Sequence, residues 1–309
     1  MVSNRTSTLT LARPNADVRQ GSTPILAASV LWGSTGTVSS LAPAGTPAAA
    51  VGSAGLVFGG LLLYIAGRGH RLRFTMSERW LLLLGAVAVA GYPVTFYPAV
   101  ARTGVAVATV VALGSAPVFA GLLAWLTGRG RPTARWCLAT LLAVIGCAVL
   151  VVGPELGASA GAIDLVGVGL AACGGLAYAV YALIGGTLIR RGHTSNAVMG
   201  AMFGGAAILV LPVVPACGPA WLTTPRGLAV ALHLAVFTTF VAYRLYGYGL
   251  RRTTIETATA LTLAEPAIAA LLGVAVVGER LPLLSWSGMA VLALGLVLLT
   301  VRTGNRDVK

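Results

Sequence analysis

The sequence predicts an all-α integral membrane protein with ten transmembrane helices, built as two inverted five-helix repeats. Of the 309 residues, 57% are hydrophobic and 9% are charged, whereas about a quarter of a soluble domain is charged. Ten apolar runs are each long enough to cross a bilayer, and the second half of the chain repeats the first. These three observations exclude an ordinary soluble domain.

The spans follow from the length of the apolar runs. A membrane helix needs about 20 apolar residues, because each adds about 1.5 Å across a hydrocarbon core about 30 Å thick. The expected spans are 24–42, 47–66, 80–100, 104–127, 134–152, 165–187, 196–214, 227–248, 254–277 and 283–301. Short connections join them, so we expect one helical bundle.

The basic residues predict the orientation of the spans. One predicted side carries Arg5, Arg13, Arg19, Arg68, Arg71, Arg73, Arg79, Arg129, Arg131, Arg135, Arg190, Arg191, Arg251, Arg252, Arg302, Arg306 and Lys309. The other side carries Arg102, Arg226 and Arg280. Cytoplasmic loops retain positive charge, so the tails 1–23 and 302–309 are expected in the cytoplasm and the linker 153–164 outside. The net charge of +13 therefore needs no nucleic-acid partner.

No cofactor, metal or disulfide is predicted. The four cysteines lie within or at the ends of apolar runs, without the close pair spacing of a zinc site. The phosphate-binding pattern GxxxxGK[ST] is absent, so transport driven by an ATP-binding domain of this chain is not expected. The predicted partners are the lipid bilayer and a small molecule, with proton coupling and the oligomeric state left open.

An internal repeat divides the chain into units at 24–152 and 165–301. The matching residues are Pro117 and Pro266, Gly128 and Gly278, Pro132 and Pro282, Trp136 and Trp286, and Gly146 and Gly295. Five spans in each unit force the second copy to enter the membrane upside down. Inverted repeats of this kind are typical of secondary transporters with a central site, and the alternative is a purely structural duplication.

Four short motifs carry a family resemblance across residues 24 to 302. They are Leu31-Trp32-Gly33-Ser34, Ser115-Ala116-Pro117, Ala264-Glu265-Pro266 and Gly278-Glu279-Arg280-Leu281. In their order and spacing the chain resembles the drug/metabolite transporter superfamily, in its ten-helix branch with paired EamA domains. The resemblance implies a cavity lined mainly by spans 1, 3, 4, 6, 8 and 9, and often export of amino acids or related metabolites. Four-helix multidrug relatives carry a carboxylate in the first span, and this chain has none there.

Glu265 is the principal candidate for substrate binding or proton coupling. An ionisable group at membrane depth is costly and needs a partner or a task. Glu265 precedes Pro266 in the ninth span, and a proline removes a backbone donor, so Pro266 is expected to break the helix, as is Pro117 in the fourth span. The structural alternative is that Glu265 satisfies backbone groups freed at the break.

The eighth span adds two further candidates on one predicted interior face, His233 and Arg244. Helical spacing places Phe237 and Phe240 between them on that face. With Glu265, these groups are expected to recognise the two charged ends of an amphoteric solute, or, for His233 and Glu265, to move a proton. The alternatives are a hydrogen-bonded packing role for His233 and extension of Arg244 to the cytoplasmic interface.

Aromatic and hydroxyl residues complete the expected substrate site. They are Trp32 and Ser34 in the first span, Tyr92 and Thr95 in the third, and Tyr178 and Tyr181 in the sixth. Such side chains combine apolar contact area with a hydrogen-bonding tip, although Tyr and Trp also populate membrane interfaces.

Together these features predict a secondary transporter of the cytoplasmic membrane, most consistent with export of an amino acid or related amphoteric solute by alternating access. A drug or cation exporter and an uptake or exchange carrier are the alternatives within the same class. A membrane enzyme is disfavoured because no H-E-x-x-H motif or nucleophile elbow occurs. A scaffold without transport is the remaining alternative.

Overall fold

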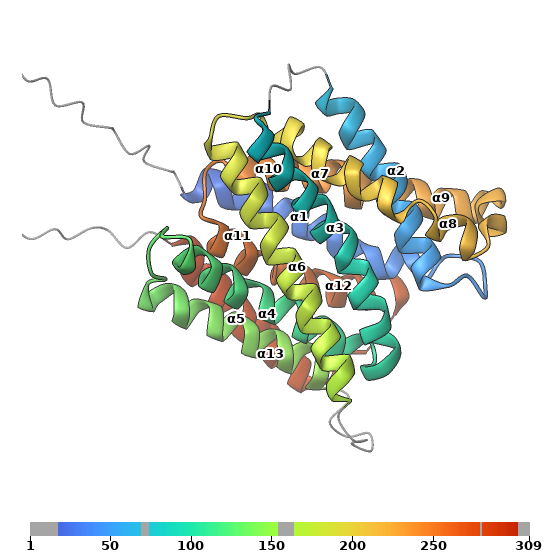
Figure 1. Cartoon of the computed structure of the whole chain (residues 1–309). Coiled ribbons are helices and arrows are strands. Elements are labelled where there is room, and N and C mark those ends of the chain that lie inside the picture. Colours follow the sequence, from blue (N-terminus) through green and yellow to red (C-terminus); the bar gives the residue numbers. More distant parts are fainter. Residues whose placement is uncertain (1–17, 69–73, 154–163, 279, 302–309) are drawn as a thin grey trace, which may run out of the picture.

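The computed structural model describes residues 18–68, 74–153, 164–278 and 280–301, and these ranges are helical with short connections (Figure 1). The first half contains α1 (Val18–Ser39), α2 (Ala48–Gly67), α3 (Met76–Thr103), α4 (Val105–Leu126) and α5 (Ala134–Val152). The second half begins with α6 (Leu165–Arg190), α7 (Ser195–Val210), α8 (Val213–Ala216) and η2 (Pro219–Thr223). It continues with α9 (Pro225–His233), η3 (Leu234–Val241), α10 (Ala242–Gly249), α11 (Ile255–Leu261), α12 (Ala264–Leu272), η4 (Gly273–Val277) and α13 (Leu283–Thr300).

The chain is an all-helical membrane protein, as predicted. Within the described ranges, nine helical stretches are long and apolar enough to cross a membrane. Three of them combine shorter elements: α7 with α8, α9 with η3 and α10, and α11 with α12 and η4. Helix α1 is the tenth. It is less apolar than the others, with several Ser, Thr and Gly residues, and it packs against α10 and α12. Its Ile25, Ala28 and Ser29 are fully buried.

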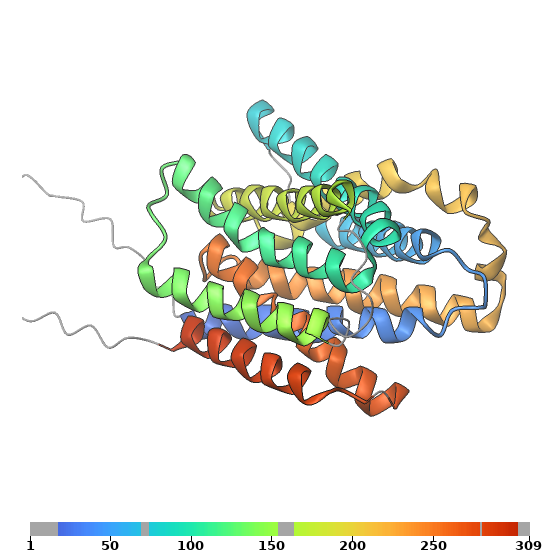
Figure 2. The same cartoon turned by 90° about the horizontal axis from the view of Figure 1, so that it is seen from below.

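The contacts between helices follow a pseudo-twofold pattern. α5 packs against α13, and α2 packs against α7, so each of these helices meets its own counterpart in the other repeat. α3 and α4 pack against α6, while their counterparts in spans eight and nine pack against α1. Figures 1 and 2 show α5 and α13 side by side along one edge of the bundle. The five-helix repeats therefore assemble as an intertwined pair.

Glycines permit the close approach of α5 and α13. A Cβ atom on Gly295 would lie 2.6 Å from the backbone nitrogen of Ala143, and one on Gly146 would overlap the backbone of Leu292. Small residues of this kind let membrane helices pack backbone to backbone. Gly146 and Gly295, which match in the sequence repeat, thus have equivalent roles in the structure.

The two predicted proline breaks have different outcomes. The ninth span is interrupted between α11 and α12, and Pro266 occupies the first turn of α12, where a missing N–H is tolerated. The expected break at Pro117 is absent, because α4 runs continuously from Val105 to Leu126 around it. An additional irregularity, the π-helix η3, interrupts the eighth span.

Candidate functional site

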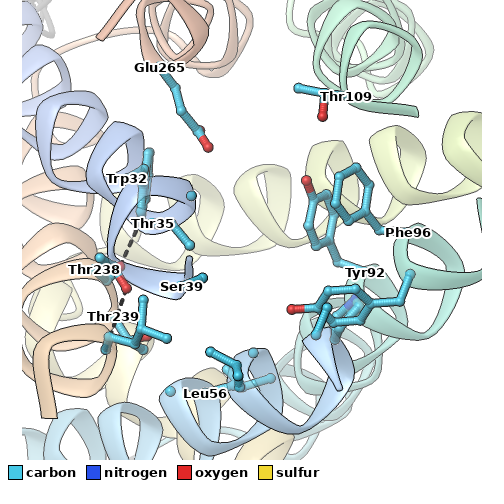
Figure 3. Close-up of a pocket in the computed structure, with 18 of the residues that line it drawn as sticks. Trp32, Thr35, Ser39, Leu56, Tyr92, Phe96, Thr109, Thr238, Thr239 and Glu265 are labelled. Carbon is cyan, nitrogen blue, oxygen red and sulfur yellow. Dashed lines mark hydrogen bonds between the residues drawn. The ribbon is translucent and has the colours of Figure 1, made fainter. Parts of the chain in front are cut away.

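A cavity of about 590 Å³ lies among α1, α2, α3, α4, α6, η3 and α12 (Figure 3). This volume is in the range of pockets that hold small organic ligands. Its polar and aromatic lining consists of Trp32, Thr35, Ser39, Thr46, Tyr92, Phe96, Tyr97, Thr109, Tyr178, Tyr181, Phe203, Thr238, Thr239, Tyr243 and Glu265. Five of the predicted site residues, Trp32, Tyr92, Tyr178, Tyr181 and Glu265, are brought together here, as is Pro266.

Glu265 extends from the first turn of α12 into this cavity (Figure 3). The break between α11 and α12 lies just before it in the chain. Among the described residues, the Glu265 carboxylate has no hydrogen-bond or ion-pair partner. It is also the one carboxylate in the described lining, which contains no Lys, Arg or His. When Glu265 is ionised, the cavity therefore carries a negative charge that suits a cationic group.

The wall opposite Glu265 is aromatic. The rings of Tyr92 and Phe96 stack with their centroids 5.4 Å apart and their planes 12° apart. Thr109 of α4 adds a hydroxyl group close to this wall (Figure 3). Aromatic faces attract cations as well as apolar groups, so this wall complements the carboxylate.

An aromatic cluster closes one end of the cavity. The rings of Trp32 and Tyr243 lie 4.9 Å apart, and those of Tyr178 and Tyr181 lie 5.0 Å apart. The hydroxyl oxygens of Tyr181 and Tyr243 are 3.3 Å apart, and the Tyr178 hydroxyl donates to Thr262 Oγ1 at 3.0 Å. Pairing the hydroxyls inside the protein avoids the cost of burying them unsatisfied.

The π-helix η3 places consecutive threonines, Thr238 and Thr239, on the cavity wall. The indole Nε1–H of Trp32 donates to the carbonyl oxygen of Thr238 at 2.8 Å. A regular 3.6-residue period does not describe a π-helical segment, whose hydrogen bonds span five residues. The face predicted as interior ran through His233 and Phe237 and so missed Thr238, Thr239 and Tyr243, and the sequence offers no clear signal for the π-helix.

Four predicted site residues lie outside this lining. Ser34 Oγ and His233 Nε2 are 2.9 Å apart and form a hydrogen bond between α1 and α9, and the Ser34 hydroxyl also contacts the carbonyl oxygen of Leu31. The Thr95 hydroxyl donates to carbonyl groups of its own helix. Arg244 is exposed, with its guanidinium 5.3 Å from the ring centroid of Phe240.

The predicted interior face of the eighth span is wrong at two positions. Arg244 is exposed, and Phe237 is 47% exposed. The buried positions are instead Leu234, Ala235, Thr238 and Thr239 within η3, followed by Ala242 and Tyr246. The buried face already runs through Val230 and Ala231 in α9, so the prediction placed the interior on the wrong side of the helix from its first turns onward.

Ten helices in two repeats around a central cavity define a membrane carrier. The EamA-like transporter family matches residues 20–152 and 165–301. The chain belongs to this family, within the drug/metabolite transporter superfamily, and is a membrane transporter rather than an enzyme.

Two relatives share most of the chain. An "Uncharacterized transporter YwfM" of Bacillus subtilis is 38% identical over 277 residues, which cover 89% of this chain and 92% of the relative. The "Threonine/homoserine exporter RhtA" of Salmonella typhimurium is 30% identical over 243 residues, covering 77% and 75% of the two chains. A solved crystal structure with 19% identity superimposes with a TM-score of 0.74 over 91% of this chain and 96% of its own. That last similarity shows the fold alone.

Proposed function

We propose that this transporter exports an amino acid or a related amphoteric solute across the cytoplasmic membrane by alternating access. The observation that carries the proposal is the Glu265 carboxylate, which has no partner among the described residues, inside a cavity of about 590 Å³. The similarity to a threonine/homoserine exporter supports the direction and the class of solute. Inverted repeats supply two related conformations around one site.

The cavity suggests how each end of such a solute is bound. The Glu265 carboxylate accepts hydrogen bonds from the ammonium group of the solute, and the stacked rings of Tyr92 and Phe96 contact the remainder of the molecule. Because the described lining lacks a basic side chain, the solute carboxylate is bound by neutral donors, of which Tyr97 and Thr109 are examples. His233 and Arg244 have no direct part in this scheme.

The direction in which the cavity opens fits the release side of an exporter. The lining includes Ser39 at the end of α1, Thr46 just before α2 and Val105 at the start of α4. The arginine distribution assigns these helix ends to the external side and both chain termini to the cytoplasm. Labelling of single cysteines in the two tails of intact cells tests this orientation, and modification of either tail by an impermeant reagent would contradict it.

A cation exporter is the second candidate, and one observation favours it. A lining with one carboxylate and no base, in the described part of the chain, binds a monocation without needing a carboxylate on the solute. Uptake or exchange of the same solutes uses the same site in the opposite direction.

Counterflow in proteoliposomes separates these functions. Vesicles loaded with an unlabelled amino acid, its decarboxylated amine or a sugar are diluted into the labelled form of the same compound. We expect accumulation of the amino acid and not of the sugar. Saturable counterflow of the amine alone would establish the cation exporter, and no counterflow with any class would contradict the proposal. Metabolites released by cells with and without the protein then identify the solute.

A further inference from the structure

Arg129 and Arg190 converge at the end of the bundle that the proposed topology places in the cytoplasm. Arg129 follows the end of α4, and Arg190 is the last residue of α6. They come from different connections, yet both side chains reach the same stretch of α6: Arg129 contacts Thr187, and Arg190 folds over the adjacent Gly186. The substrate cavity includes neither residue.

The positions of both guanidinium groups are defined by neighbouring groups. Arg129 Nη2 donates to Thr187 Oγ1 at 2.6 Å. The Arg190 side chain folds back over Gly186, where its Nη1 would lie 3.4 Å from a Cβ atom. The start of α11 borders the same spot, since Ile255 Cγ1 would lie 2.9 Å from that Cβ. The pair is thus held at the junction of α4, α6 and α11.

The positive charge at this junction is incompletely balanced. Both arginines experience the field of Glu256, but neither forms an ion pair within 4.0 Å in the described part of the chain. Partial desolvation lowers the pKa of Arg129, the Glu256 carboxylate opposes this, and the nearby Arg191 adds to it. Two cations held together in this way are stabilised by a bound anion.

The internal repeat shows that the helix ends themselves do not require these charges. In the internal repeat, α1 is the counterpart of α6. The positions that match Arg190 are Ser40 and Leu41, which follow α1 and carry no charge. Ala106 is the second residue of α4, as Glu256 is the second residue of α11. Retention of positive charge in the cytoplasm explains why arginines occur on this side, but it does not explain their convergence on one junction.

We propose that Arg129 and Arg190 bind the phosphate group of an anionic phospholipid. A guanidinium group matches the geometry of a phosphate through two parallel N–H donors. Arg129 lies three residues beyond the last residue of α4, and Arg190 ends α6, so both are placed at the depth of lipid headgroups. Basic pockets between transmembrane helices on the cytoplasmic side bind such headgroups.

Lipid binding to the purified full chain tests the site directly. Native mass spectrometry measures the affinity for phosphatidylglycerol of the wild type, of Arg129→Gln/Arg190→Gln and of the control Arg68→Gln/Arg79→Gln. The control removes the same charge from exposed cytoplasmic-side arginines elsewhere. We expect roughly 25-fold weaker binding in the first double variant, from about fivefold per arginine, and a change below about threefold in the control. Arg129→Lys/Arg190→Lys, which keeps the charge, should recover part of the affinity.

Three results would overturn the proposal. Equal affinity in the two glutamine double variants would show that only total charge matters. Equal binding of phosphatidylcholine by the wild type would remove the requirement for an anionic lipid. Displacement of phosphatidylglycerol by inorganic phosphate at equal concentration would identify a soluble phosphate as the ligand. The readout is independent of transport, so failure of the proposed export function would not affect it.

Discussion

The indole nitrogen of Trp32 donates a hydrogen bond to the carbonyl oxygen of Thr238, 206 residues later in the chain. This bond joins α1 of the first repeat to the π-helix of the second, directly beside the cavity. Trp32 also contacts Tyr243 and Tyr246 through its ring. One side chain therefore links the two repeats, the irregular helix and the aromatic end of the cavity.

Replacing Trp32 with Phe separates the hydrogen bond from the ring contacts. We expect Trp32→Phe to lower the free energy of unfolding by about 1 kcal/mol, because one buried hydrogen bond is lost. Thermal unfolding in detergent measures this loss. Trp80→Phe, at a side chain that is 61% exposed, is the matched control. Equal unfolding temperatures of the two variants would contradict a structural role for the bond.

Replacing Glu265 with Gln tests the charge in the cavity while keeping the shape of the side chain. We expect flux in proteoliposomes to fall about ten- to 100-fold, since a hydrogen bond to a charged group contributes about 1.5–3 kcal/mol. Membrane expression should be unchanged. Glu256→Gln, outside the cavity lining, is the control, and wild-type flux of Glu265→Gln at every pH would exclude both ammonium binding and proton coupling by this residue.

His233 is predicted to have a packing role, in contrast to Glu265. Its Nε2 is paired with Ser34 Oγ at 2.9 Å, away from the cavity lining. We expect His233→Gln and Ser34→Ala to keep flux within about twofold of the wild type, because each removes only neutral hydrogen bonds, of roughly 1 kcal/mol each, outside the cavity lining. The dependence of flux on pH provides the sharper measurement. Its disappearance in His233→Gln alone would restore this residue as a proton-coupling group.

The contact between α5 and α13 should tolerate no added methyl group at Gly146. A Cβ atom there would overlap the backbone of Leu292, and overpacking of this kind costs typically about 1–3 kcal/mol. We expect Gly146→Ala to unfold at a lower temperature in detergent. Gly169→Ala in α6, where no atom lies within 4 Å of the added carbon, should leave the unfolding temperature unchanged. Equal unfolding temperatures of the two variants would contradict the close packing of α5 against α13.

Asp164 caps the N-terminus of α6, and the stability that it provides depends on pH. The backbone N–H of Gly167 and the Arg102 guanidinium, 3.0 Å away, hold the pKa of Asp164 below its ordinary value. A carboxylate with a lowered pKa stabilises the fold at pH values above about 3.9, its value in the unfolded chain. That stabilisation is lost as the pH falls through the lower pKa of the folded state.

Asp164→Asn retains a capping side chain but removes the titration. We expect the melting temperature of the wild type to fall more steeply than that of this variant as the pH is lowered below about 4. Parallel pH profiles for the two proteins would contradict a stabilising ion pair.

The sequence was informative wherever a regular period or a strong charge bias applied. The apolar runs predicted the helices closely, as for 134–152, which is α5 in full. A costly carboxylate beside a proline pointed to Glu265, which the structure places in the cavity. In contrast, the interior face of the eighth span was misplaced: Thr238 and Thr239 line the cavity, whereas His233 and Arg244 lie outside its lining.

The sequence by itself determined the number of spans, the repeat and its inversion, because hydrophobic length and an odd number of crossings follow from residue order alone. Only the tertiary structure decided which side of each helix faces the cavity and that no base accompanies Glu265 in the described lining. The physical reason is that an apolar residue is equally stable against lipid or against another helix. In a membrane, hydrophobicity therefore reports the depth of a residue but not its direction, which is set by packing and hydrogen bonds between helices.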